Sequence, residues 1–435
     1  VLNNPHLKAI FPAFSGDDDY RDRFYSPGGA MKLGNRLLWI AGNLRNPDYE
    51  PPDFRRFIWT LPLRRADLVT TGARSEMYQE ALNHPADDEF WQSISIRKRL
   101  KEVRVPVFSV GGWYDNFVES DLEAYSILSK KPNIHRILIG PWPHNMSIRL
   151  TGADFGPNWF VALRRTQMEW FDQWLRNKDV ALMSRPPVRI FVMGANEWRD
   201  EREWPLARAR ATRFYLAGGG HANTSNGDGQ LTSRTQKNSP PDRFVYDPRN
   251  PVPTMGGAVC CDPKIFPWGP MDQRGIEKRA DVLVYTTPPL RECLEVTGPV
   301  SVVLHASSSA MDTDFTVKLI DVFPGGQALN LTDGILRARY RNSLEKPSPL
   351  EPGKIYKLTI DAGVASNLFR KGHRLRLEVS SSNFPRFDRN PNTGRAVADE
   401  TELRKASQIV FHDREQASYL VVPVVPESHS PRQGH

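Results

Sequence analysis

The stretch VPVFSVGGWYDNF, residues 105–117, decides the fold of this 435-residue chain. Its first eight residues form a short, nearly continuous apolar run bounded by proline and glycine, which is typical of a strand buried on both faces. A helix-like stretch at 119–131 follows, and then comes a second apolar run, HRILIG at 135–140. Another amphipathic stretch at 163–178 again indicates a helix. Strand, helix, strand, helix in this order predicts a parallel α/β sheet.

Two regions with different sequence patterns flank this predicted sheet. In residues 31–100 apolar residues recur at spacings of three and four, which predicts a helical cap. From about residue 183 the chain turns into short stretches punctuated by Gly and Pro, several of which alternate apolar and polar residues, as in HRLRLEV at 373–379. Such a pattern predicts a β-sandwich or jelly roll. We therefore expect an α/β domain over 1–182, with its cap at about 31–100, and a β-domain over 183–430.

Composition and charge exclude several classes of protein. The chain is 39% hydrophobic and 25% charged, which is ordinary for a folded protein. No apolar run approaches the ~18 residues of a membrane helix, so we expect no membrane association. The net charge of +8 is spread along the chain without a basic block, which argues against nucleic-acid binding. The sequence that begins at Val1 carries no targeting pattern, so it does not indicate the cellular compartment of the protein.

Cysteine usage predicts neither a disulfide nor a metal site. The three cysteines are Cys260, Cys261 and Cys293. Adjacent cysteines rarely pair with each other, and no Cys/His spacing typical of a metal site is present. We therefore expect no structural disulfide, no metal and no cofactor.

Two side chains that can carry chemistry come directly after the two buried runs. Asp115 follows the first run and His144 follows the second, at the carboxyl edge where ligands bind in open α/β sheets. An acid and then a histidine is the second half of the Ser–Asp–His order of α/β-hydrolases. In that triad the imidazole takes the proton of the nucleophile and the carboxylate orients the imidazole. The alternative is a helix-capping aspartate and a structural histidine.

No serine in the chain completes this triad by its local pattern. A G-x-S-x-G turn is absent from the sequence, and the serine runs at 307–309 and 380–382 lie in strand-like stretches. Those serines are poor candidates for a nucleophile.

Six stretches together resemble one family. They are LKAIFPAF at 7–14, DDDYRDRFYSPGGA at 17–30, VPVFSVGGWYDNF and LIGPWPHNM around the two runs, DPRNPVPTMGGAVCC at 247–261 and LEVSSSNFPRFDRNPNTG at 377–394. In these the chain is similar to the CocE/NonD acyl hydrolases and to their relatives, the X-Pro dipeptidyl-peptidases and α-amino acid ester hydrolases. The resemblance covers nearly the whole chain.

The resemblance implies an α/β-hydrolase with a helical cap, followed by an all-β jelly-roll domain. Asp115 and His144 match the triad acid and base of the family. The serine nucleophile and the oxyanion tyrosine lie upstream of LKAI in the family, and so would precede Val1. On this interpretation the α/β-hydrolase domain is incomplete, and the chain by itself is inactive.

The resemblance also places the walls of a substrate pocket. Phe24, Trp39 and Phe117 match aromatic positions that surround the acyl group, which implies an apolar slot. A core role for Trp39 is the alternative, because it lies at helical spacing with its leucine neighbours. The acidic run Asp17–Asp19 could hold a cation, but we expect it to form a turn.

Three functional hypotheses remain open at this point. The leading one is a serine-type hydrolase of a small-molecule ester or amide, with the serine upstream. The alternatives are an X-Pro dipeptidyl-peptidase and a non-catalytic jelly-roll binding protein. The loop 116–118 after Asp115 carries no charge, which favours uncharged acyl groups. A homo-oligomer is compatible with all three.

Overall fold

The structure is a computed structural model and describes residues 4–130 and 134–426. Its first sheet has four strands in the order β1 (Val107–Tyr114), β2 (His135–Pro143), β3 (Val188–Val192) and β4 (Glu197–Glu201). The first three are parallel and β4 is antiparallel to β3. Every residue of β1 and β2 is buried, as expected for strands covered on both faces. The predicted parallel sheet is confirmed.

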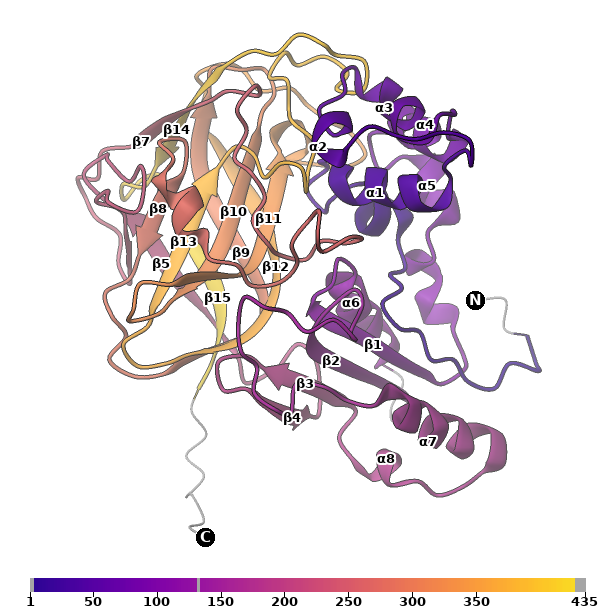
Figure 1. Cartoon of the computed structure of the whole chain (residues 1–435). Helices are drawn as coiled ribbons and strands as arrows, with labels where there is room; N and C mark the ends of the chain where they lie inside the picture. The colour runs from indigo at the N-terminus through magenta and orange to yellow at the C-terminus, as the bar shows by residue number, and fades with distance from the viewer. Residues whose placement is uncertain (1–3, 131–133, 427–435) are drawn as a thin grey trace.

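Helices connect these strands. α6 (Val118–Leu128) joins β1 to β2, and α7 (Leu163–Arg176) and α8 (Ala181–Ser184) lie between β2 and β3. The apolar segment near the start of the chain runs parallel to β1, with bridges from Ile10 and Ala13. Figure 1 shows α6 on the side of the sheet that faces the helical cap and the β-domain, and α7 on the opposite side.

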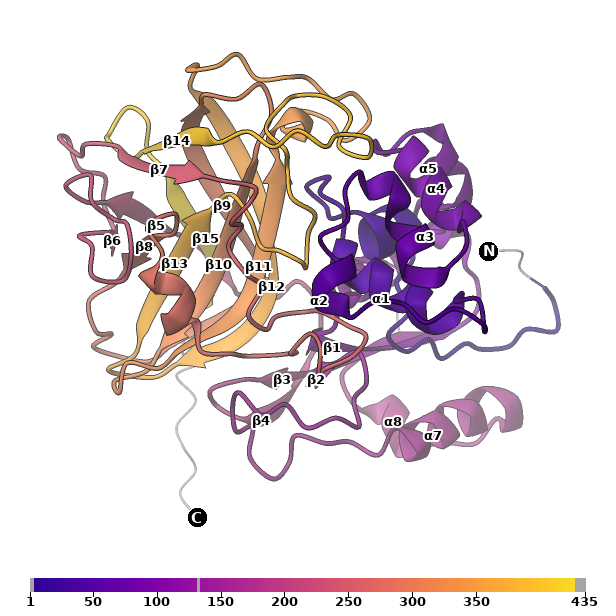
Figure 2. The same cartoon turned by 45° about the horizontal axis from the view of Figure 1, so that its top comes forward.

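The helical cap is built from short helices. They are η1 (Asp19–Phe24), α1 (Leu33–Asn43), α2 (Phe54–Phe57), η2 (Leu63–Arg65), α3 (Ala66–Thr71), α4 (Glu76–Asn83), α5 (Glu89–Ile94) and η3 (Arg97–Glu102). Asp88 caps α5 by accepting a hydrogen bond from the backbone N–H of Phe90, as its place before the apolar run predicts. The group packs around its own core, which includes Tyr20, Leu37 and Trp91. Both views show the cap beside the β-domain (Figures 1 and 2).

The remaining strands form the β-domain. They are β5 (Arg210–Ala217), β6 (Gln230–Thr232), β7 (Asp242–Tyr246), β8 (Leu283–Thr286), β9 (Leu294–Ser308), β10 (Asp314–Val322), β11 (Ala328–Arg337), β12 (Tyr356–Phe369), β13 (Arg374–Ser380), β14 (Ala406–Phe411) and β15 (Tyr419–Val425), with 3₁₀ turns η4 (Gln273–Lys278) and η5 (Ala338–Tyr340). They are hydrogen-bonded in the order β11-β10-β13-β8-β6-β5-β15-β9-β14-β7, and β12 pairs with β9. Because β12 also contacts β11 and β10, the sheet folds over itself into a sandwich.

The alternation in HRLRLEV is confirmed in β13. Leu375, Leu377 and Val379 are fully buried in the core of the sandwich. The charged residues face the other way, where Arg376 pairs with Glu277. Within the described residues, no helix combines the length and the apolar character that crossing a membrane requires.

Two strands that the sequence assigns to the β-domain belong to the first sheet instead. β3 and β4 lie after residue 183, yet β3 pairs with β2 and β4 pairs with β3. The strands of the sandwich begin only with β5 at Arg210. Val188 and Ile190 are fully buried, so β3 has the same character as β1 and β2. The sequence of a short apolar strand does not specify which sheet the strand joins. For this reason the sequence pattern assigned these two strands to the β-domain.

Candidate active site

The ends of β1 and β2 bring Asp115 and His144 together. The two strands approach closely at Gly112, where a Cβ atom would lie 2.2 Å from the carbonyl oxygen of Trp142. Only glycine permits this spacing. At the carboxyl edge Tyr114 lies opposite Pro143. The next residue of each strand therefore emerges at the same point of the edge.

Asp115 and His144 form a hydrogen-bonded pair. Nδ1 of His144 lies 2.9 Å from Oδ1 of Asp115. Asp115 is fully buried, whereas the His144 side chain is 38% exposed. Among the described residues Nε2 of His144 has no hydrogen-bond partner. The imidazole is therefore held through Nδ1, while Nε2 is left without a partner among the described residues.

Asp115 and His144 each favour the charged form of the other. Burial raises the pKa of Asp115, and the hydrogen bond with His144 opposes this increase. Burial alone would lower the pKa of His144, but the hydrogen bond and the charge of Asp115 outweigh it and raise that pKa above the ordinary value. Such a pair stabilises an imidazolium when His144 accepts a proton at Nε2.

The three aromatic residues predicted as pocket walls lie in two places. The ring of Phe117 meets the imidazole of His144 edge-on, with centroids 5.4 Å apart. Phe24 is buried in the cap and Trp39 is partly exposed on α1. The guanidinium of Arg36 lies 4.3 Å from the Phe24 ring and 5.2 Å from the Trp39 ring. The two cap aromatics that the resemblance placed in a purely apolar slot thus have a guanidinium group beside them.

Sequence reasoning gave no role to two further residues near the pair. The Phe14 ring lies 6.2 Å from the imidazole of His144, and the Arg23 guanidinium lies 5.6 Å from the Phe117 ring. Phe14 ends the stretch LKAIFPAF, so that motif was the available signal. Nothing in the sequence places Arg23 close to Phe117, because only the folded cap brings them together.

The acidic run at 17–19 forms a capped turn, as expected. The side chain of Asp18 accepts the backbone N–H of Arg21 at the start of η1. Asp17 pairs with Arg97 at 2.8 Å, and Asp19 pairs with Arg23 at 2.6 Å. Asp17 and Asp19 are therefore each paired with an arginine. In the part of the chain that the structure describes, no group of three or more His, Cys, Asp or Glu residues is arranged to hold a metal ion.

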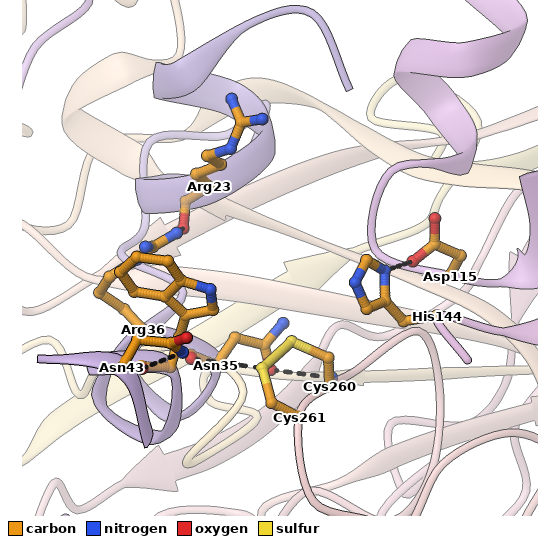
Figure 3. The surroundings of a disulfide bond; sticks show 9 residues. Arg23, Asn35, Arg36, Asn43, Asp115, His144, Cys260 and Cys261 are labelled. Atoms are coloured by element: carbon orange, nitrogen blue, oxygen red, sulfur yellow. Dashed lines mark hydrogen bonds and ion pairs between the residues drawn. A yellow bond between two sulfur atoms is a disulfide. The ribbon is translucent and has the colours of Figure 1, made fainter. Parts of the chain in front are cut away.

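The expectation about cysteines is wrong for one pair. Cys260 and Cys261 form a disulfide with each other. The loop that carries them packs against α1, where the backbone N–H of Cys260 donates to Oδ1 of Asn35. Figure 3 shows this disulfide in one view with the Asp115–His144 pair and with Arg36 of the cap. The rule against adjacent pairing describes how often such pairs occur, and this loop is an exception to it.

A second Ser–His–Asp chain lies inside the β-domain and was not predicted. Oγ of Ser239 lies 2.7 Å from Nδ1 of His412, and Nε2 of His412 lies 2.7 Å from Oδ2 of Asp242. All three side chains are at least 95% buried. Ser239 also donates to the backbone carbonyl of Gly218. Because no substrate can reach this serine, the chain is a structural network rather than a second active site.

The serine runs that the sequence analysis rejected are also remote from His144 in the fold. Ser307 and Ser308 end β9, and Ser380 ends β13 within the sandwich. All three are buried. Oγ of Ser380 lies 2.6 Å from the hydroxyl of Thr316. Their contacts are those of a β-sandwich interior.

Comparisons with known proteins cover both halves of the chain. Residues 1–146 match the profile of the X-Pro dipeptidyl-peptidase (S15 family), and residues 181–421 match the X-Pro dipeptidyl-peptidase C-terminal non-catalytic domain. The cocaine esterase of Rhodococcus sp. (strain MB1 Bresler) is 40% identical over 96% of this chain and 76% of its own length.

Two solved structures are similar over almost the whole chain. An aminopeptidase from the marine sediment archaeon Thaumarchaeota archaeon superposes with a TM-score of 0.82 at 27% identity, covering 97% of this chain and 73% of its own. An α-amino acid ester hydrolase superposes with a TM-score of 0.81 at 26% identity and the same coverage. The architecture of sheet domain, cap and β-domain is therefore shared with enzymes that cleave ester or amide bonds.

Proposed function

Since the chain belongs to the CocE/NonD family of serine acyl hydrolases, related to the S15 X-Pro dipeptidyl-peptidases, we propose that Asp115 and His144 are two members of its catalytic triad. The third member is a serine from a segment that precedes Val1 in the complete protein. The substrate is a small-molecule ester or amide. The observation that carries this proposal is the buried Asp115 bonded to Nδ1 of an imidazole whose Nε2 is unpaired among the described residues.

In this mechanism His144 moves the protons. Nε2 takes the proton of the serine hydroxyl as the oxygen attacks the carbonyl carbon of the substrate. The imidazolium then gives that proton to the leaving alcohol or amine, and an acyl-enzyme remains. Water repeats the sequence and releases the acid. Asp115 holds the tautomer with the proton on Nδ1 and stabilises the imidazolium, in line with the raised pKa of His144.

A serine-directed fluorophosphonate tests the location of the nucleophile. The complete protein should be labelled at one serine upstream of Val1, because only a serine activated by a base reacts readily. The 435-residue chain alone should remain unlabelled. The labelled peptide is identified by mass spectrometry. Labelling of a serine within the 435 residues would contradict this proposal.

The groups around the pair also indicate acyl selectivity. The loop after Asp115 supplies Asn116 and Phe117 rather than carboxylates. The guanidinium groups of Arg23 and Arg36 lie over the aromatic rings of this region. Arg23 is already paired with Asp19, so an α-ammonium group near these rings would lose its hydration beside the Arg36 guanidinium without gaining a free carboxylate. We therefore expect uncharged acyl groups to be preferred over α-amino acyl groups.

A matched pair of esters measures this preference in the complete protein. The value of kcat/KM for a phenylacetyl ester should exceed that for the phenylglycine ester by at least about tenfold at neutral pH, the ratio that ~1.4 kcal/mol gives. Replacing Arg36 with Met should narrow the difference. A preference for the amino ester would favour the amino ester hydrolase or dipeptidyl-peptidase hypothesis instead.

A further inference from the structure

A small cavity adjoins Asp115 where the sheet domain, the cap and the β-domain meet. It offers about 20 Å³ to a water molecule, which is roughly the space that one ordered water needs. The ionisable and amide groups that line it come from all three parts of the molecule. Lys32 precedes α1 of the cap, Asp115 and Asn116 lie in the turn between β1 and α6, and Glu119 lies in the first turn of α6. The β-domain contributes Asp333, Asp361 and Arg386.

Three residues that line this cavity each have a hydrogen-bond acceptor atom with no donor partner among the described residues. Oδ2 of Asp115, Oδ1 of Asn116 and Oδ1 of Asp333 are buried and have no hydrogen-bond partner among the described residues. Buried acceptors are rarely left unpaired, because each has lost its hydration. Because all three residues line this one small cavity, we expect a donor to lie there.

The ammonium group of Lys32 makes fewer hydrogen bonds to the described residues than it has N–H donors. Its side chain is buried, with the residue 7% exposed, and Nζ donates one hydrogen bond to the backbone carbonyl of Asp22 at 3.1 Å. An ammonium group has three N–H donors, so two are unused within the described part of the chain. Burial lowers the pKa of Lys32, while the carboxylates of Asp22, Glu119 and Asp115 act in the opposite direction.

We propose that this cavity binds one ordered water molecule that links Lys32 to the triad acid. The water accepts a hydrogen bond from Nζ of Lys32 and donates to Oδ2 of Asp115 and to one neighbouring acceptor. Lys32 is in this way a positioning residue: it acts on His144 through Asp115 and does not touch the substrate. The catalytic meaning of this link rests on the proposed function, but the link itself can be measured without activity.

The sign of the effect follows from the charges around the cavity. The ionisable groups that line it are Lys32, Asp115, Glu119, Asp333 of β11, Asp361 of β12 and Arg386. Two further carboxyl groups interact with these residues from outside the lining: Asp22 of η1 with Lys32, and Asp121 of α6 with Asp115. Arg386 is committed to Asp333 at 2.8 Å. Lys32 has no such ion pair with any residue that the structure describes, and the carboxylates of Asp22, Glu119 and Asp115 all act on its ammonium group. Removing its charge favours every protonated form of the Asp115–His144 pair, so the apparent pKa of the pair must rise.

The variant Lys32→Met tests this in the complete protein, because Met keeps most of the volume and removes the charge. The pKa of His144, read by NMR of the imidazole without substrate and assigned with His144→Gln, should rise by about one unit. If the protein is an active hydrolase, the acid limb of its kcat/KM profile should move up equally, which is a tenfold loss of activity below the limb. Lys318→Met is the matched control, because Lys318 is also buried but pairs with Glu378 in the β-domain.

An unchanged His144 pKa in a folded Lys32→Met protein would overturn the inference, and so would an equal shift in Lys318→Met. If Lys32→Met does not fold, a high-resolution crystal structure of the unaltered protein decides. It should show a water within hydrogen-bond distance of Nζ of Lys32 and of Oδ2 of Asp115. An empty cavity, or a direct bond between Lys32 and Asp115, would overturn the inference. Because the NMR measurement needs no substrate, its failure is distinct from failure of the proposed function.

Discussion

Replacing His144 with Ala is expected to lower the kcat of the complete protein for ester hydrolysis by about a millionfold, the scale on which loss of a triad base acts. In the proposed mechanism alanine removes the nitrogen that accepts the serine proton and the acid that returns it to the leaving group. The ring is partly exposed and contacts the Phe14 and Phe117 rings only edge-on. The protein should therefore remain folded. Initial rates with a chromogenic short-chain ester measure the effect.

His305→Ala is the matched control for this variant. His305 lies in β9, far from the carboxyl edge of the first sheet, and its Nδ1 contacts the backbone carbonyl of Ala417. Its loss should leave kcat within about twofold of the unaltered protein, since surface substitutions away from the site act mainly on stability. A loss of less than about a hundredfold in His144→Ala would show that another group serves as the base.

The parts of this fold that the sequence predicted are those with local causes. A buried parallel strand needs an apolar run, and the residue after it lies at the carboxyl edge whatever surrounds the sheet. For this reason the positions of Asp115 and His144 followed from two short stretches. Their pairing needed in addition only that β1 and β2 be neighbours, which is usual for strands that follow each other along the chain.

The parts that the sequence missed depend on distant partners. β3 and β4 look like any short strands, and only the edge offered by β2 assigns them to the first sheet. Lys32 precedes a helix, where a lysine is ordinarily solvated, yet packing of the cap against the β-domain buries it. In the same way Ser239, Asp242 and His412 meet across 173 residues of sequence. No local pattern encodes such contacts.

The contribution of Asp115 can be measured separately from that of His144 by a substitution that keeps the shape of the side chain. Asn at position 115 has the size of Asp but no charge. Its amide can donate a hydrogen bond to Nδ1 of His144. This bond stabilises the tautomer that carries its proton on Nε2, and in that tautomer Nε2 cannot accept the serine proton. Because Asp115 is fully buried, no solvent replaces the lost carboxylate. The imidazolium also loses its counter-ion.

Asp115→Asn is therefore expected to lower kcat by about ten-thousandfold and to lower the pKa of His144, because the carboxylate is what raises it. Both are measured in the complete protein, by ester hydrolysis and by NMR of the imidazole. Asp67→Asn is the matched control: Asp67 is also fully buried, but it lies on α3 of the cap, where its Oδ2 accepts a hydrogen bond from the backbone N–H of Ser75. That variant should change neither quantity. If Asp115→Asn kept the His144 pKa, the carboxylate would not be the partner that sets the charge of the imidazole, and the triad assignment would fail.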